Sequence, residues 1–251
     1  VSPRHLRRRP PAADLRRPRP VNRTLVLFDI DGTLLLTAGA GRRAILRAIG
    51  EVVAPDADIG RIRFDGKTDP QIVMELLSAG RHPTPREPAL VARLCERYVE
   101  FLEQELAAPV GATTVLPGVG PLLDRLEQEP GVVLGLLTGN VVPGAALKLR
   151  SGGLRPERFV VGAYGSDSHR RPDLPAIAAE RARPWFGSPP SGSAVVIIGD
   201  TPADVTCGRG IGARSVGVAT GSYGAEQLAA AGASAVFDDL TDTERVLERI
   251  L

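Results

Sequence analysis

The sequence has few of the side chains that build disulfide frameworks or zinc sites. Its two cysteines, Cys95 and Cys207, lie far apart in the chain, and its three histidines are the scattered His5, His82 and His169. We therefore expect two buried thiols in a reducing compartment, with no disulfide and no zinc site. Long apolar runs are also absent, since none approaches the ~20 residues of a membrane-spanning helix. The composition thus predicts a cytoplasmic protein that does not cross a membrane.

Lysine is almost absent, because Lys67 and Lys148 are the only lysines among 31 basic residues. Many of the arginines gather in residues 1–20, where seven arginines and five prolines accompany a single acid. A segment this charged and this poor in apolar residues cannot pack a core. We expect residues 1–21 to be a disordered basic leader. No function is assigned to it, because a solvated tail is favoured over nucleic-acid binding and no apolar export region follows.

The 251 residues are 43% hydrophobic and 24% charged, which suits one main globular domain with an insertion. A buried strand is predicted at residues 25–28, and it runs directly into Asp29-Ile30-Asp31-Gly32. Ligands of open α/β sheets bind beyond the carboxyl ends of the strands. Two carboxylates at i and i+2 repel each other, and a divalent cation is the usual way to keep at least one of them ionised. Such a pair could provide one nucleophile and one acid/base. The alternative is a polar turn chosen for its geometry.

Two further apolar strands also end in polar motifs. Residues 132–137 lead into Thr138-Gly139-Asn140, which together with the free amides of the next helix would cradle a phosphate. Residues 194–198 lead into Gly199-Asp200-Thr201-Pro202-Ala203-Asp204, whose oxygen ligands suit Mg²⁺ rather than zinc. Between these motifs lies a basic loop at Arg170 and Arg171. It either neutralises charge on a phosphoryl group or is an exposed basic pair.

Residues 41–114 contain no strand of the opening kind and predict a helical cap domain inserted into a core of 22–40 and 115–251. Helices are expected there over 42–53, 70–79 and 88–106. The polar segment of Gly66, Lys67, Thr68 and Asp69 is predicted to descend onto the active site and read the substrate. Thr68 or Asp69 could equally be a simple helix N-cap.

The rest of the chain alternates between strands and helices. Residues 34–41 are expected to form a flexible loop, and residues 221–224 a turn. The remaining helices are predicted at 119–127, 145–150, 174–183, 225–231 and 241–251, and the remaining strands at 159–163, 215–218 and 235–237.

In order and spacing, the three strand-end motifs and the loop at Arg171 resemble the four motifs of the haloacid dehalogenase-like (HAD) superfamily. The position of the cap is similar to the helical C1 cap of the branch containing phosphoglycolate phosphatase and β-phosphoglucomutase. The resemblance runs from about residue 22 to the end of the chain. It implies an α/β fold, with a Rossmann-like doubly wound parallel sheet and an inserted C1 cap, and it implies a Mg²⁺ cofactor.

The resemblance also assigns roles to individual residues. Asp29 would be the nucleophile that forms an aspartyl-phosphate, and Asp31 would protonate the leaving alkoxide and then activate water. The phosphoryl oxygens would be bound by Thr138, Gly139 and Asn140. The metal would be held by Asp29, the Asp31 backbone carbonyl and Asp200, with Asp204 as a further ligand or a support for the others.

The third motif departs from the family pattern, because most relatives place a lysine where this loop has only arginines. Arg171, which precedes Pro172, is the chosen cation, although a guanidinium is bulkier than an ammonium. Lys148 is the rival. It is expected about two turns into a helix and away from the sheet edge, which makes it the weaker candidate.

The resemblance therefore implies a Mg²⁺-dependent phosphatase that acts on a small soluble phosphomonoester, phosphoglycolate-like or a sugar phosphate. Dehalogenases and phosphonatases of this fold lack an acid equivalent to Asp31. A phosphomutase stays open as an alternative, since it keeps all four motifs, and a non-catalytic binding protein is the alternative from another class. The expected partner is a small phosphorylated metabolite rather than nucleic acid or a membrane, and a monomer or homodimer is expected.

Overall fold

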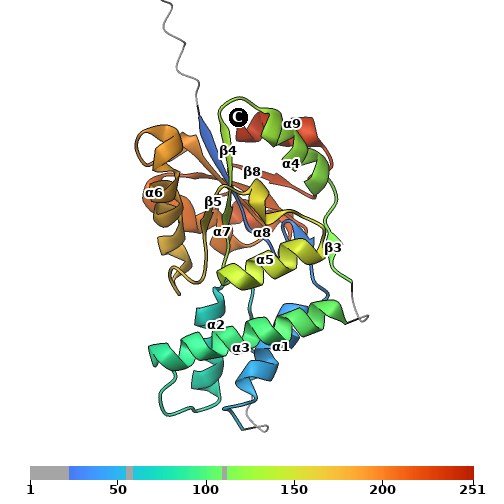
Figure 1. Cartoon of the computed structure of the whole chain (residues 1–251). Helices are drawn as coiled ribbons and strands as arrows, with labels where there is room; N and C mark the ends of the chain where they lie inside the picture. Colours follow the sequence, from blue (N-terminus) through green and yellow to red (C-terminus); the bar gives the residue numbers. More distant parts are fainter. Residues whose placement is uncertain (1–22, 55–58, 109–111) are drawn as a thin grey trace, which may run out of the picture.

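Six parallel strands form the centre of the protein, whose computed structural model describes residues 23–54, 59–108 and 112–251 (Figure 1). The predicted basic leader, residues 1–21, lies outside the described residues. The strand order is β5-β4-β1-β6-β7-β8. This order confirms the doubly wound α/β sheet. The strands are β1 Thr24–Phe28, β4 Val132–Leu137, β5 Val161–Ala163, β6 Val195–Gly199, β7 Arg214–Val218 and β8 Ala235–Phe237.

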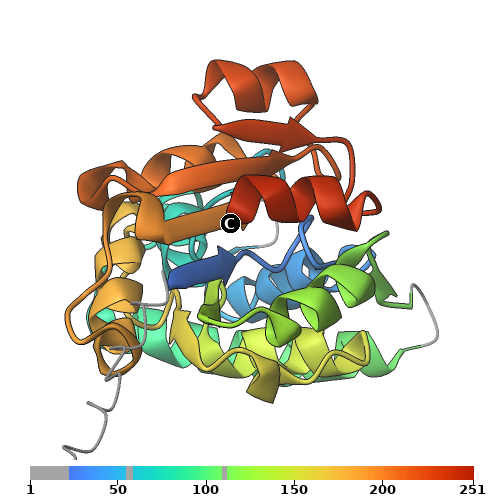
Figure 2. The ribbon, with the colours of Figure 1, turned by 90° about the horizontal axis from the view of Figure 1, so that it is seen from above.

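Helices cover both faces of this sheet, which explains why its central strands are almost wholly apolar (Figure 2). Alternate residues of β1 point to opposite faces, so Val26 and Phe28 join one apolar cluster while Leu25 and Leu27 join the other. The first cluster includes side chains of α4 (Val119–Gln128), α5 (Val142–Ser151) and α9 (Thr243–Ile250). The second includes side chains of α6 (Leu174–Phe186) and α7 (Pro202–Cys207), and α8 (Ala225–Ala230) packs beside β7 and β8.

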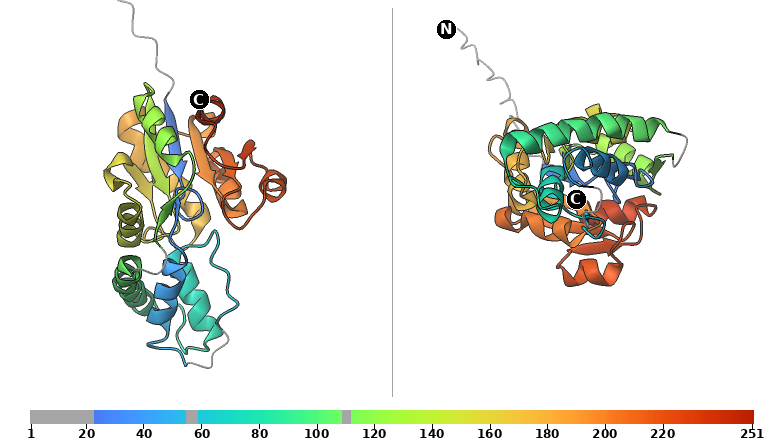
Figure 3. Two further views of the ribbon diagram at one scale, coloured as in Figure 1. Left: turned by 90° about the vertical axis from the view of Figure 1, so that its right-hand side faces the viewer. Right: turned by 90° about the horizontal axis from the view of Figure 1, so that it is seen from below.

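A separate helical layer lies beyond the carboxyl ends of the strands (Figure 3). It consists of α1 (Ala40–Ile49), α2 (Asp69–Ala79) and α3 (Pro88–Ala107), which share an apolar cluster distinct from those of the sheet. This cluster supports the proposed cap. The chain enters and leaves the layer through a two-stranded antiparallel ribbon of β2 (Leu35–Leu36) and β3 (Thr114–Val115). We expected only a loop at residues 34–41, because two-residue strands carry no readable alternation.

The boundaries of two helices differ from the predicted ones, and local chemistry explains each difference. Helix α1 ends at Ile49, not at residue 53, because Gly50 caps it. Helix α5 begins at Val142 rather than at residue 145, because a proline is tolerated in a first helical turn. Among the described residues, no helix has both the length and the apolarity for a bilayer span. Short 3₁₀ turns lie at Pro156–Arg158, Arg171–Asp173, Gly192–Ala194 and Gly208–Ile211.

Candidate active site

The carboxyl ends of β1, β4 and β6 lie side by side, so the three motifs that follow them meet in one place. A cavity of about 360 Å³ opens there, between the sheet edge and helices α1, α2 and α3. The sequence-predicted residues that line it are Asp29, Asp31, Lys67, Asp69, Thr138, Gly139, Asn140, Arg171 and Asp200, together with the cap residue Gly66.

Three acidic side chains form the floor of the site. Asp29, Asp200 and Asp204 are all buried, and each offers a carboxylate oxygen within 4.8 Å of the others. Burial raises the pKa of Asp29 to about 6 and the pKa of Asp200 to about 8, despite the opposing charge of Arg171 near Asp29. Buried carboxylates this close need a positive charge to stay ionised, and oxygen donors are the ligands that Mg²⁺ prefers. The donor set therefore fits a hard divalent cation.

Two glycines make room for the Asp200 carboxylate. Gly32 has a φ of +80°, a left-handed conformation that favours glycine, and a Cβ there would overlap Asp200. A Cβ at Gly221 would overlap the Asp200 Oδ2 atom in the same way. On the other side, the Thr33 hydroxyl donates a hydrogen bond of 3.0 Å to Asp200 Oδ1. Gly221 belongs to the segment that the sequence predicted only as a turn, so its role at the site was missed.

Arg171 lies inside the site and is not an exposed loop cation. It is 4% exposed, and its Nη2 atom is 3.2 Å from Asp29 Oδ1 and ion-paired with Asp204. Burial opposes the charge of Arg171, but the two carboxylates outweigh it and raise its pKa. The other Asp204 oxygen accepts hydrogen bonds from the Thr201 amide at 3.0 Å and hydroxyl at 2.6 Å. With both oxygens engaged, Asp204 holds Arg171 beside Asp29.

Lys148 also reaches the site, so the expectation that it lies away from the sheet edge is wrong. Its Nζ atom is 2.8 and 2.7 Å from the two carboxylate oxygens of Asp31, and the residue is 4% exposed. The reason is the course of α5, which lies between the sheet edge and α3 (Figure 1). A residue two turns along this helix therefore still faces the motif after β1. Burial lowers the pKa of Lys148, but Asp31 and Asp69 outweigh it and leave the pKa raised.

The motif after β4 also holds Asp31. The Asn140 amide donates hydrogen bonds of 2.8 Å to Asp31 Oδ2 and of 2.8 Å to the Thr138 hydroxyl oxygen. The Asn140 Oδ1 atom is buried and has no hydrogen-bond partner among the described residues. Asp31 itself is only part-buried, with 43% of its side chain exposed. Asp31 is therefore held from two sides while its remaining surface faces the cavity.

The predicted cap segment touches the motif after β4. The Asp69 amide donates to the Gly139 carbonyl at 2.8 Å, and Asp69 Oδ2 accepts from the Val141 amide at 2.8 Å. Burial raises the pKa of Asp69 to about 6. Thr68 is the N-cap of α2, and its hydroxyl also donates to the carbonyl of His169 at 2.8 Å. The segment is thus both a helix start and a bridge to the core.

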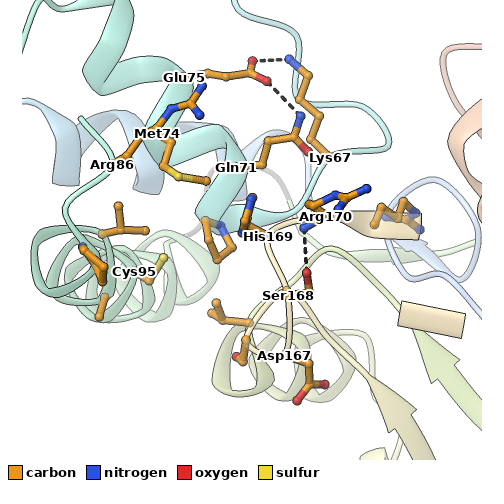
Figure 4. Close-up of a pocket in the computed structure, with 18 of the residues that line it drawn as sticks. Lys67, Gln71, Met74, Glu75, Arg86, Cys95, Asp167, Ser168, His169 and Arg170 are labelled. Carbon is orange, nitrogen blue, oxygen red and sulfur yellow. Dashed lines mark hydrogen bonds and ion pairs between the residues drawn. The ribbon is translucent and has the colours of Figure 1, made fainter. Parts of the chain in front are cut away.

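The Lys67 side chain is turned to Glu75 in a neighbouring groove of about 1630 Å³ (Figure 4). Gln71 donates a hydrogen bond of 3.0 Å to the other Glu75 oxygen. This groove separates α2 and α3 from the loop at residues 165–172, on the outer side of the cap segment. The ammonium of Lys67 is therefore already paired, while its backbone carbonyl lies against Gly139.

Tyr98 was missed entirely by the sequence reasoning. It lies on α3, is 1% exposed and lines the same cavity as Asp29 and Lys148. Its apolar ring fits the buried stripe of an amphipathic helix, which is how a tyrosine in such a pattern is normally interpreted. No sequence signal distinguishes a tyrosine that only packs from one whose hydroxyl also faces a cavity.

Comparison with known proteins finds HAD-like hydrolases and phosphatases. The Hydrolase-like family model, described as HAD-hydrolase-like, matches residues 172–243. Phosphoglycolate phosphatase of Rhodospirillum rubrum is 28% identical over 225 residues, which cover 85% of this chain and 86% of that protein. A predicted phosphoglycolate phosphatase from Haemophilus somnus 129PT superposes with a TM-score of 0.68 at 19% identity, covering 90% of this chain and 99% of that one. CbbY from Rhodobacter sphaeroides, solved in complex with phosphate, has a TM-score of 0.64 at 22% identity and covers 87% and 95% of the two chains.

Proposed function

We propose that this chain, which is similar to HAD-like hydrolases and to phosphoglycolate phosphatases, is a phosphatase of that kind and hydrolyses a small phosphomonoester with the help of Mg²⁺. Phosphatase activity agrees with its relatives. The substrate, the metal and the residue roles are our proposal. A small phosphorylated metabolite, phosphoglycolate or a compact sugar phosphate, suits a cavity of about 360 Å³.

The observation that carries the proposal is the presence of two differently held carboxylates in one cavity. Asp29 is buried and lies beside Arg171, whereas Asp31 is part-buried and bound by Lys148 and Asn140. Two carboxylates in such different surroundings suit different tasks. A phosphatase of this family needs both a nucleophile and an acid/base, and the site supplies one candidate for each.

In the proposed reaction, the Asp29 carboxylate attacks phosphorus and the bond to the ester oxygen breaks. Asp31 gives its proton to the departing alkoxide, and an aspartyl-phosphate remains on Asp29. Asp31 then takes a proton from water, which attacks the phosphorus and releases phosphate and free Asp29. Arg171, together with Thr138 and the amides that follow β4, stabilises the negative charge on the phosphoryl oxygens.

The metal in this proposal is bound by Asp29 and Asp200, with the backbone carbonyl of Asp31 as the further ligand implied by the resemblance. When bound, Mg²⁺ supplies positive charge that screens the phosphoryl oxygens from the nucleophile. Asp204 acts as a support, because its two oxygens already bind Arg171 and Thr201.

The helical layer acts as a cap in this proposal. The segment from Gly66 to Asp69 closes the cavity by its hydrogen bonds to Gly139 and Val141. Closure excludes water around the charged intermediate and limits the size of the leaving group. We therefore propose that residues 41–114 select the substrate, while residues 22–40 and 115–251 perform the chemistry. A cytoplasmic location and a monomeric or dimeric state stay predictions.

The test is phosphate release from a panel of phosphoglycolate, sugar phosphates, nucleotides and phosphonates, with Mg²⁺ and with EDTA. We expect metal-dependent release that is strongest on one small ester and abolished in Asp29→Asn. Asp124→Asn, on the exposed surface of α4, is the control and should match the wild type. Substantial turnover by Asp29→Asn would refute the nucleophile. Isomerisation of a sugar phosphate without phosphate release would show a phosphomutase instead.

A further inference from the structure

Arg171, the proposed cation for the phosphoryl group, lies at the end of a loop of residues 164–171 whose two halves are held differently. The first half is fixed to the core, because Asp167 forms an ion pair of 2.7 Å with Arg181 of α6. The second half, residues 168–170, leads directly into Arg171. The contacts of this second half therefore bear on where the guanidinium lies.

The second half of the loop is tied to the segment at the start of α2. The Thr68 hydroxyl donates a hydrogen bond of 2.8 Å to the carbonyl of His169, two residues before Arg171. Among the described residues, the other hydrogen bonds of residues 168–170 are local and stay within 168–173 (Figure 4). Thr68 thus provides the link between this half of the loop and the helical layer.

Thr68 has a fixed position of its own. It is fully buried, and its hydroxyl oxygen also accepts a hydrogen bond of 3.2 Å from the Gln71 amide, as the N-cap of α2. The backbone beside it lies directly against Gly139, where a Cβ would lie 2.0 Å from the Lys67 carbonyl oxygen. Only a glycine at position 139 permits this approach. The Thr68 hydroxyl is therefore placed by both the helix and the sheet edge.

The same segment packs against the second support of Arg171. A Cβ on Gly66 would lie 3.0 Å from Thr201 Oγ1. That hydroxyl donates a hydrogen bond of 2.6 Å to Asp204, which is the ion-pair partner of Arg171. The segment therefore contacts both structures that hold this guanidinium, the loop through Thr68 and the Asp204 side through Gly66.

We propose that Thr68 is a positioning residue for Arg171, so that closure of the proposed cap holds the cation beside Asp29. The inference rests on the proposed function, and it adds that the cap acts on the chemical step as well as on access to the cavity. Thr68 is buried and is not among the residues that line the cavity, unlike its neighbours Lys67 and Asp69. It therefore acts through the loop and not on the leaving group. Because every ester carries the same phosphoryl group, its effect is common to all of them.

The experiment measures kcat and KM for phosphate release from phosphoglycolate and several sugar phosphates at saturating Mg²⁺. Thr68→Val removes the hydroxyl and retains the shape of the side chain. It should lower kcat about 3- to 10-fold on every ester, the range for one hydrogen bond, and leave the order of the KM values unchanged. Thr68→Ser keeps the hydroxyl and should retain most of the activity.

Thr68→Val also removes a helix N-cap, so its control removes one as well. Glu87 is the exposed N-cap of α3 and accepts hydrogen bonds from the Ala89 and Leu90 amides. Glu87→Ala should lower the free energy of urea unfolding to a similar extent while kcat stays unchanged. A second test combines Thr68→Val with Arg171→Met. If Thr68 acts through Arg171, its loss should have little further effect on kcat once the guanidinium is gone.

The outcomes separate this inference from the proposed function. An unchanged kcat in folded Thr68→Val overturns the inference alone. So does a loss that differs from ester to ester, which would mean that Thr68 acts on the leaving group. An equal loss of kcat in Glu87→Ala, or a full further loss in the Arg171→Met background, overturns it as well. Absence of release from every ester by the wild type overturns the inference and the proposed function together.

Two replacements keep the test decisive if a variant does not fold. Thr68→Ala also removes the hydroxyl and takes the place of Thr68→Val. If the double variant does not fold, the comparison of Thr68→Val with Thr68→Ser and Glu87→Ala decides, because a loss of kcat that only the hydroxyl prevents is the expected result.

Discussion

Replacing Arg171 is the most direct way to test how the site handles the charge of a phosphoryl group. Its Nη2 atom lies 3.2 Å from Asp29 and is paired with Asp204, and all three side chains are buried. At an effective dielectric constant of about 20, two unit charges at that distance interact by roughly 5 kcal/mol. This energy is an upper limit for the stabilisation that Arg171 gives to a negative charge beside it. Losing one preorganised donor to a developing oxyanion costs about 100- to 1000-fold in kcat. We expect Arg171→Met to fall in that range.

The same substitution should weaken the fold, because it leaves Asp29 and Asp204 buried without their cation. Removal of one partner of a buried ion pair costs about 3–5 kcal/mol in the free energy of unfolding. Arg171→Lys keeps the positive charge but replaces the planar guanidinium with a compact ammonium. We expect it to retain more activity and more stability than Arg171→Met.

The assay is steady-state phosphate release on several esters at saturating Mg²⁺, with urea unfolding of each variant measured alongside. Because Arg171 acts on the phosphoryl group, its loss should reduce all esters by a similar factor. Folded Arg171→Met with activity within a few-fold of the wild type would refute the reasoning. So would a larger loss in Lys148→Met on every ester, which would make Lys148 the phosphoryl cation.

Three further outcomes are expected. Gly221→Ala forces the Asp200 carboxylate to move and should raise the Mg²⁺ concentration for half-maximal activity about 10-fold or more, whereas Gly224→Ala, whose Cβ would meet nothing within 4 Å, should not. Burial raises the pKa of Asp69 to about 6 from 3.8, so its ionisation destabilises the folded state as pH rises from about 4 to 6. Asp69→Asn should remove up to about 3 kcal/mol of the resulting decrease in the free energy of urea unfolding. A variant whose free energy of unfolding still falls with pH as much as that of the wild type would contradict this prediction. Mg²⁺ should raise the Tm of the wild type, and this shift in Tm should be smaller in Asp200→Asn. An equal shift in the two proteins would mean that the metal binds elsewhere.

The sequence was sufficient to predict the sheet and the edge of the sheet at which most of the candidate site residues lie. Buried parallel strands are continuous apolar runs, so the strands that precede Asp29, Thr138 and Asp200 could be predicted with their ends. The carboxyl edge of such a sheet gathers whatever follows its strands. That rule depends only on chain order and strand direction. It therefore predicts from the sequence that three of the four motifs lie together.

Contacts made across the fold were decided only by the tertiary structure. The position of Lys148 depends on the course of α5 between sheet and cap, and that of Tyr98 on how α3 packs against it. Neither can be read from spacing along the chain, because residues 98 and 148 come to line one cavity only through packing between elements that are distant in sequence. The place of Arg171 in the site could not be predicted from the sequence either. An arginine in a polar loop looks solvated, and only its burial between Asp29 and Asp204 makes it part of the site.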